Sequence, residues 1–142
     1  MKTATHLIPL AFAILFISCV GPPELDDGLV KNLPSVVNTP DAFTFILKAD
    51  NYTFDETYDL SLSLVDSTDI VVTTLLVTGF VRGDSTQIAV LNALGVPLLP
   101  LMIDGDYSYV SVDSAKTYSP KKVNVRGRNL TGELNFILTK GN

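Results

Sequence analysis

Residues 58–65 read YDLSLSLV, and this stretch alternates without interruption between apolar and polar side chains. In an extended chain its three leucines share one side, and Asp59, Ser61 and Ser63 share the other, because successive side chains of a strand point to opposite faces. A period of two indicates a strand with one face buried and the other in contact with water. This stretch therefore predicts a β-strand, and the flanking sequence is compared with it.

The same period recurs on both sides of this stretch. Turn-forming residues separate the repeats, as in residues 82–85 (RGDS) and in Asp104-Gly105-Asp106, which we interpret as a hairpin-type turn. Seven or eight short strands broken by turns predict an all-β fold, an antiparallel β-sandwich. The further segments that alternate or are rich in β-branched residues are 43–47, 70–77, 87–92, 107–112, 122–126 and 134–139.

Residues 104–138 contain a pattern that extends beyond single strands. A Gly-x-Tyr strand (Gly105, Tyr107) leads through a loop with Tyr118 to a Val-x-Val strand (Val123, Val125). This order resembles the closing half of transthyretin-like and carboxypeptidase-regulatory-like modules, over about a quarter of the chain. The resemblance implies a β-sandwich of the transthyretin-like or immunoglobulin-like type, and it assigns no functional residue.

The N-terminus has the features of an export signal. Lys2 precedes an apolar run of eleven residues, 7–17, which has the length of a signal-peptide core and is too short to span a membrane. The run leads into LFISC at 15–19, which resembles a bacterial lipobox, with Phe16 where that family usually has leucine. The resemblance implies cleavage before Cys19, diacylglycerol on its sulfur and a fatty acid such as palmitate on the new amine. The alternative is an ordinary secretory signal beside which Cys19 is incidental.

The position of this signal divides the chain into three parts. Residues 1–18 are read as the lipoprotein signal peptide, 19–40 as the lipidated cysteine with a flexible tether, and 41–142 as the β-sandwich domain. Proline and glycine recur in the tether and disfavour regular structure, although Leu33, Val36 and Val37 could dock there as a first edge strand.

The residue after the lipidation site bears on location. Val20 follows Cys19, whereas in enterobacterial lipoproteins an aspartate there favours retention at the inner membrane. We therefore expect the membrane as a partner through lipid on Cys19, and a location in the cell envelope at the outer membrane.

Charge and composition narrow the function. The chain has ten Lys+Arg and fifteen Asp+Glu; removing residues 1–18 takes away Lys2 and the only histidine, His6, so the mature net charge is −6. An acidic body argues against nucleic acid as a partner. With no histidine and with Cys19 lipidated, Ser-His-Asp and Cys-His catalysis and nitrogen- or sulfur-based metal sites are excluded.

These exclusions predict a protein that is not an enzyme and has no cofactor. Carboxylate chemistry is what remains, because two acids that meet in space can hydrolyse a glycoside, so a carboxylate-only hydrolase stays as an alternative. Asp104 and Asp106 offer oxygen ligands for a cation, but an Asp-Gly-Asp sequence is most often a turn, and we read it so.

A row of basic side chains is the candidate binding site. Lys122, Arg126 and, if the strand continues past Gly127, Arg128 share the face opposite Val123 and Val125. One hypothesis is that this row binds an anionic envelope polysaccharide, in a manner that weakens as salt rises. The other is that the row faces water or acids of the same domain, such as Asp59.

The most apolar stretch of the mature chain, residues 94–103 (LGVPLLPLMI), has two interpretations. Pro97 and Pro100 bar it from a central strand. We expect a kinked edge strand with Leu98, Leu101 and Ile103 in the core; the alternative is an exposed apolar edge that receives another envelope protein.

The predicted function follows from these features together. We expect a lipid-anchored, non-enzymatic envelope protein that provides a binding or assembly surface. The alternative of the same kind is an accessory subunit of an envelope or fimbria-like complex, in which another chain covers residues 94–103.

Overall fold

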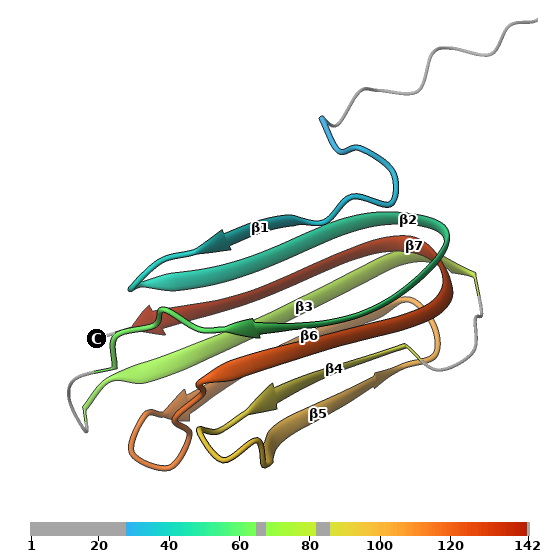
Figure 1. The fold of residues 1–142 in the computed structure, drawn as a ribbon. Helices are drawn as coiled ribbons and strands as arrows, with labels where there is room; N and C mark the ends of the chain where they lie inside the picture. The colour runs from blue at the N-terminus through green and yellow to red at the C-terminus, as the bar shows by residue number, and fades with distance from the viewer. Residues whose placement is uncertain (1–27, 65–67, 82–85, 142) are drawn as a thin grey trace, which may run out of the picture.

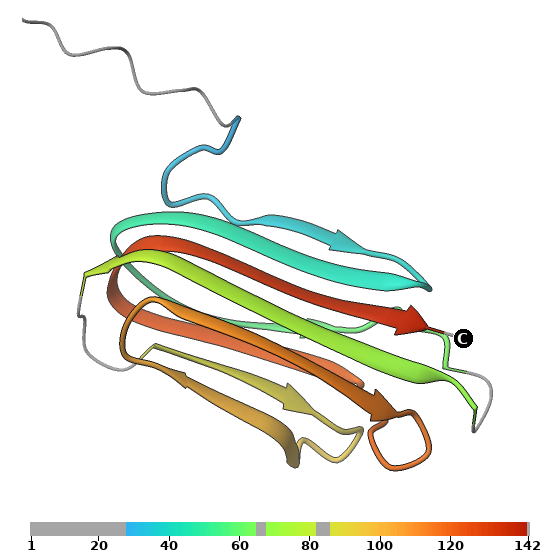
Figure 2. The ribbon, with the colours of Figure 1, turned by 180° about the vertical axis from the view of Figure 1, so that it is seen from behind.

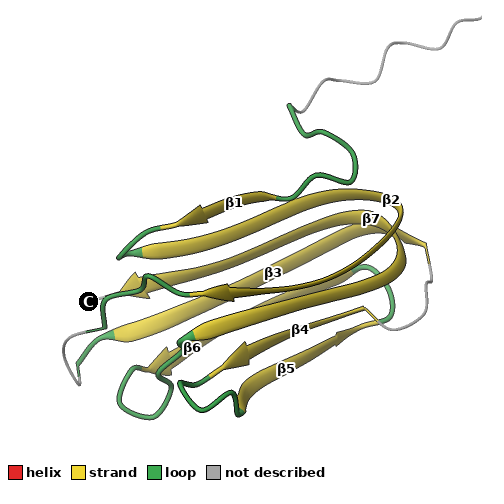
Figure 3. Ribbon diagram, viewed as in Figure 1, coloured by secondary structure: helices red, strands yellow, loops and turns green. Residues whose placement is uncertain are grey.

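The computed structural model describes residues 28–64, 68–81 and 86–141, which form antiparallel strands and no helix (Figure 3). This confirms the predicted all-β fold. Within these ranges no helix is long and apolar enough to cross a membrane. The signal peptide, Cys19 and the turn at 82–85 lie outside the described residues. The strands are β1 (Ser35–Asn38), β2 (Ala42–Asp59), β3 (Ile70–Val81), β4 (Thr86–Leu91), β5 (Pro97–Ile103), β6 (Tyr107–Ser114) and β7 (Lys122–Gly141).

Two long strands, β2 and β7, run through both layers of the sandwich (Figure 1). Residues 42–49 of β2 pair with 132–139 of β7, and after a bend residues 52–59 pair with 122–130. On its other side β7 pairs with β3 through its second half and with β4 through its first half. Layer 1 therefore contains β1, the first half of β2, the second half of β7, β3 and β6; layer 2 contains the remaining halves with β4 and β5.

The prediction of separate short strands at 43–47 and 58–65, and at 122–126 and 134–139, was wrong in its boundaries. Each pair contributes to one continuous strand, apart from residues 60–64, which follow β2 outside any strand. The chain turns between layers without a loop, because Asn51, Asn129 and Gly132 adopt positive φ angles of 51°, 53° and 135° at the bend. Asparagine and glycine tolerate this conformation better than other residues.

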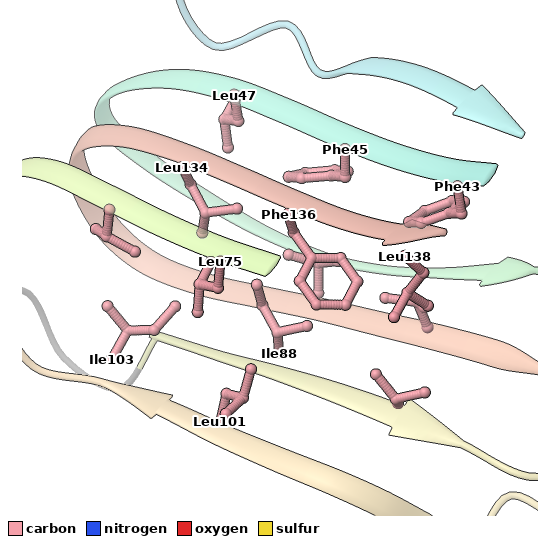
Figure 4. Packing of buried hydrophobic residues seen from close by; sticks show 14 of the residues in the cluster. Phe43, Phe45, Leu47, Leu75, Ile88, Leu101, Ile103, Leu134, Phe136 and Leu138 are labelled. Atoms are coloured by element: carbon pink, nitrogen blue, oxygen red, sulfur yellow. The ribbon is translucent and has the colours of Figure 1, made fainter. Parts of the chain in front are cut away.

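The core lies between the two layers, as Figure 4 shows. Phe43, Phe45 and Phe136 of layer 1 point toward Ile88 and Leu101 of layer 2, and the three phenylalanines have no exposed surface. The apolar residues that alternate with other residues at 43–47, 87–92, 122–126 and 134–139 are buried in β2, β4 and β7, as the sequence pattern predicted; they are Phe43, Phe45, Leu47, Ile88, Val90, Val123, Val125, Leu134, Phe136 and Leu138. Period-two alternation thus identified the core correctly.

The expected edge strand within residues 94–103 is β5, which pairs with β4 alone. Leu101 and Ile103 are buried, and Leu98 is partly buried against the core, which confirms the interpretation that we favoured. The same stretch leaves Leu94 and Met102 exposed, at 87% and 63% of their surface.

The prediction of a hairpin at residues 104–106 was wrong. These residues connect β5 in layer 2 to β6 in layer 1, where β6 pairs with β3. The Asp106 carboxylate accepts a hydrogen bond of 2.8 Å from the backbone N–H of Phe80, near the end of β3. This contact holds the connection against layer 1, so the chain crosses between layers and does not fold back on β5.

The part of the tether that the structure describes joins the sheet. The possibility of a first edge strand near residues 33–37 is realised as β1, whose residues pair with 43–46 of β2. Just before β1, the Asn32 side chain accepts a hydrogen bond from the backbone N–H of Asp50 (2.8 Å) and donates one to its carbonyl (3.1 Å). The ordered body thus extends to the N-terminal side of residue 41.

Candidate interaction surface

The described sheet has unpaired borders at β1 and β6 in layer 1, and at β5 and the second half of β2 in layer 2. An open edge invites pairing with another chain, and proteins protect such edges with short strands, proline or charge. Three borders carry one of these devices. β1 has four residues, β5 contains Pro97 and Pro100, and the β2 half contains Asp55, Glu56 and Asp59.

The border at β6 has the least of this protection. It is eight residues long (YSYVSVDS), has no proline, and has a single charge at Asp113. Among the described residues it pairs only with β3, and it does so over its full length. Figure 2 shows β6 as the last strand of layer 1 on this side. Half of its backbone N–H and C=O groups therefore point away from the sheet.

The outward face of β3 and β6 adds apolar surface to this open edge. Val110 lies opposite Thr74, and Val112 lies opposite Val72. Val110 and Val112 are 63% and 61% exposed, unusually high values for neighbouring valines on one face. The face carries no charge; its residues are Ile70, Val72, Thr74, Leu76, Ser108, Val110, Val112 and Ser114.

The opposite side of β6 is polar and aromatic. Tyr107 and Tyr109 stack with ring centroids 6.3 Å apart and planes 10° from parallel. The Ser111 hydroxyl donates a 2.9 Å hydrogen bond to the Asp113 carboxylate. Tyr118 lies in the loop after β6 and is buried. Burial raises the pKa of its phenol to about 12, and the Thr73 hydroxyl lowers this pKa by a smaller amount. The phenol is therefore neutral at physiological pH.

The predicted basic row lies elsewhere, on the outward face of layer 2, and β7 does continue past Gly127. Lys122 Nζ lies 3.3 Å from a carboxylate oxygen of Asp59, and Arg126 Nε lies 3.4 Å from one of Asp55.

Arg128, the third member of this row, is exposed and forms no ion pair with any residue that the structure describes. Two of the three cations thus have acid partners in the same domain, through exposed pairs that contribute about 0.2–1 kcal/mol each. Binding of an anionic polysaccharide stays a prediction, which retention on such a polymer at rising salt would test.

Within residues 28–64, 68–81 and 86–141, no three His, Cys, Asp or Glu side chains are placed to hold a metal ion together. Asp106 is engaged with the Phe80 N–H, and Asp104 is exposed to solvent. The sequence singled out this pair and the basic row, and it predicted a strand at 107–112, but it did not show that this strand is an open edge, because an edge is recognised only once the neighbours of a strand are known.

Comparisons with known proteins do not assign this chain to a family. No protein-family model matches the sequence, and no curated protein matches it. One solved structure, from work describing how "Bacillus endospore appendages form a novel family of disulfide-linked pili", is similar over 77% of this chain and 90% of its own, with 15% identity and a TM-score of 0.41.

Proposed function

We propose that this protein is a bacterial lipoprotein, exported and held at the outer membrane by lipid on Cys19, whose β-sandwich is a non-enzymatic assembly module. Its contact surface is the open edge of β6 together with the uncharged outward face of β3 and β6. The observation that carries the proposal is that β6 is the one border of the described sheet without proline, clustered charge or extreme shortness.

A strand edge of this kind recognises another extended chain. Backbone hydrogen bonds along the added strand supply affinity, and side chains at alternate positions supply specificity. Val110 and Val112 would lose part of their contact with water to the side chains of the added strand, which is favourable by about 25 cal/mol per Å² of apolar surface buried. An anchor at Cys19 would confine the domain to the membrane surface and raise its effective concentration there.

The exposed part of residues 94–103 is the weaker candidate for the contact with an accessory-complex partner. Leu94, Val96 and Met102 are exposed, but Pro97 and Pro100 remove donors from the β5 edge. A partner strand could not form a regular ladder there. If the protein is an accessory subunit of an envelope or fimbria-like complex, we therefore expect contact at β6.

Lipidation is tested by replacing Cys19 with serine. We expect cells fed a labelled fatty acid to label the unmodified protein, and Cys19→Ser to lose both the label and retention in the membrane fraction, because serine offers no thiolate for acylation. Ser18→Ala, which keeps a small residue before the cleavage point, should remain labelled and membrane-bound. Label that persists on Cys19→Ser would contradict the anchor.

Assembly at β6 is tested by the double variant Val110→Lys, Val112→Lys. The unmodified protein, extracted in mild detergent, should sediment as a species larger than one chain, and the double variant should sediment as a single chain. Lysines on the outward face of an edge strand oppose pairing, and at 63% and 61% exposure they can reach water without disturbing the core.

The matched control for this variant is Met102→Lys, at a site 63% exposed on β5. It adds a lysine at the same exposure on a different edge and should leave the sedimentation unchanged. Equal sedimentation of all three proteins would contradict a contact surface at β6.

A further inference from the structure

We infer that the chain that pairs with β6 is a second copy of this protein, in an antiparallel arrangement with a two-fold axis through Ser111. This inference rests on the proposed role of β6 as a contact surface and adds the identity and register of the partner. Pairing of two β6 strands would join layer 1 of one copy to layer 1 of the other in one continuous sheet.

The geometry of antiparallel pairing limits the registers that are possible. Residues directly opposite each other point to the same face of the sheet. On β6 the even-numbered residues point outward, and the odd-numbered residues share the side of buried Val71 and Leu75, as the pairing with β3 shows. Two copies can therefore pair only where even residues meet even residues, which requires a two-fold axis through a residue.

An axis through Ser111 matches the side chains of the two strands. Val110 lies opposite the partner's Val112, and Val112 lies opposite the partner's Val110, so four exposed valines form one cluster. Tyr109 lies opposite the partner's Asp113, where a phenol can donate a hydrogen bond to a carboxylate. Ser108 lies opposite the partner's Ser114, so every pair is complementary in size or chemistry.

Neighbouring registers match less well. An axis through Val110 places Val112 opposite the partner's Ser108 and leaves one valine pair in place of two. An axis through Val112 places Val110 opposite the partner's Ser114 and shortens the paired segment to residues 110–114. Of these registers, only the one centred on Ser111 places both valines of each copy opposite a valine of the partner.

Charge also favours a second copy at this edge over the second half of β2. The mature chain carries a net charge of −6, so two copies repel each other wherever their acids meet. Self-pairing through the second half of β2 would bring Asp55, Glu56 and Asp59 against the same residues of the partner. At β6 the outward face is uncharged, and the single acid, Asp113, meets the partner's Tyr109.

Cysteine cross-linking in cells that express the full-length chain tests this register. Opposed Cβ atoms in an antiparallel pair lie about 4.5–5.5 Å apart, close to the range of about 3.5–4.5 Å found in disulfides. Under mild oxidation, Ser111→Cys should link to a product of twice the chain mass. Chains with Val110→Cys should link to co-expressed, differently tagged chains with Val112→Cys more strongly than either variant links to itself.

Two controls accompany these variants. Met102→Cys places an equally exposed thiol on β5 and should give no dimer. The unmodified chain, whose only cysteine is Cys19, should give none either if that sulfur is lipidated. A dimer from the unmodified chain would count against the anchor alone, and the β6 variants are then compared in a Cys19→Ser background.

The possible results separate this inference from the proposed function. A Ser111→Cys dimer together with the mixed Val110–Val112 product supports the second copy in this register. The inference is overturned if neither product forms, if Val110→Cys links to itself most strongly, or if the linked product contains a different protein. Assembly that is lost in the Val110→Lys, Val112→Lys variant without any self-linked dimer would leave the contact surface at β6 and remove the second copy.

Discussion

Replacing Phe136 with alanine is expected to lower the free energy of unfolding by about 3–5 kcal/mol. Phe136 lies in the second half of β7, between Phe45 of β2 and Leu75 of β3 in register, and it has no exposed surface. Its ring also meets that of Phe43 edge-on, at a centroid distance of 6.4 Å. The substitution would leave a cavity at the centre of the interface between the layers.

A loss of this size is a large part of the total stability of a domain, which is about 5–15 kcal/mol. The melting temperature, followed by the β-sheet circular dichroism signal of the protein in mild detergent, should fall by about 12 °C or more, at about 4 °C per kcal/mol. Met102→Ala is the control, because that side chain is 63% exposed, and a surface change of this kind should stay within about 0.5 kcal/mol. Equal losses for the two variants would contradict the packing of the layers through Phe136.

Gly132→Ala is expected to destabilise the bend through which β7 passes between layers. Gly132 has a φ angle of 135°, which side chains rarely adopt, and a Cβ there would lie 2.9 Å from the carbonyl oxygen of Thr78 and 3.0 Å from that of Gly79. The backbone conformation costs about 1–3 kcal/mol, and the displacement of β3 adds about 1–3 kcal/mol. The same melting experiment measures the loss.

Gly95→Ala separates these two contributions. Gly95 also has a positive φ, 77°, but a Cβ there has no atom within 4 Å. This variant should therefore lose only the backbone contribution, about 1–2 kcal/mol. If Gly132→Ala cost no more than Gly95→Ala, the close approach of β7 to the end of β3 would not be needed for the fold.

The positions of most strands, and the buried face wherever polar and apolar residues alternate, could be predicted from the sequence. Alternation at Leu134, Phe136 and Leu138 identifies the interior because burial of apolar surface is the main driving force and the strand period is fixed at two. Pro97 and Pro100 identified an edge strand because proline has no backbone N–H to donate to a neighbouring strand. The row of Lys122, Arg126 and Arg128 followed from alternation as well.

The connections between strands and the identity of the open edges could not be predicted from the sequence, because both depend on contacts between distant residues. Asn51, Asn129 and Gly132 permit a bend at residues 49–54 and 127–132, but the sequence does not show whether the chain reverses there or continues in the same strand. The continuity of β2 and β7 through the bend depends on their pairing with each other. Residues 104–106 look like a hairpin locally, yet they cross between layers. The open edge of β6 results from strand order, which is set by pairings between residues far apart in the chain, and such pairings leave no pattern within β6 itself.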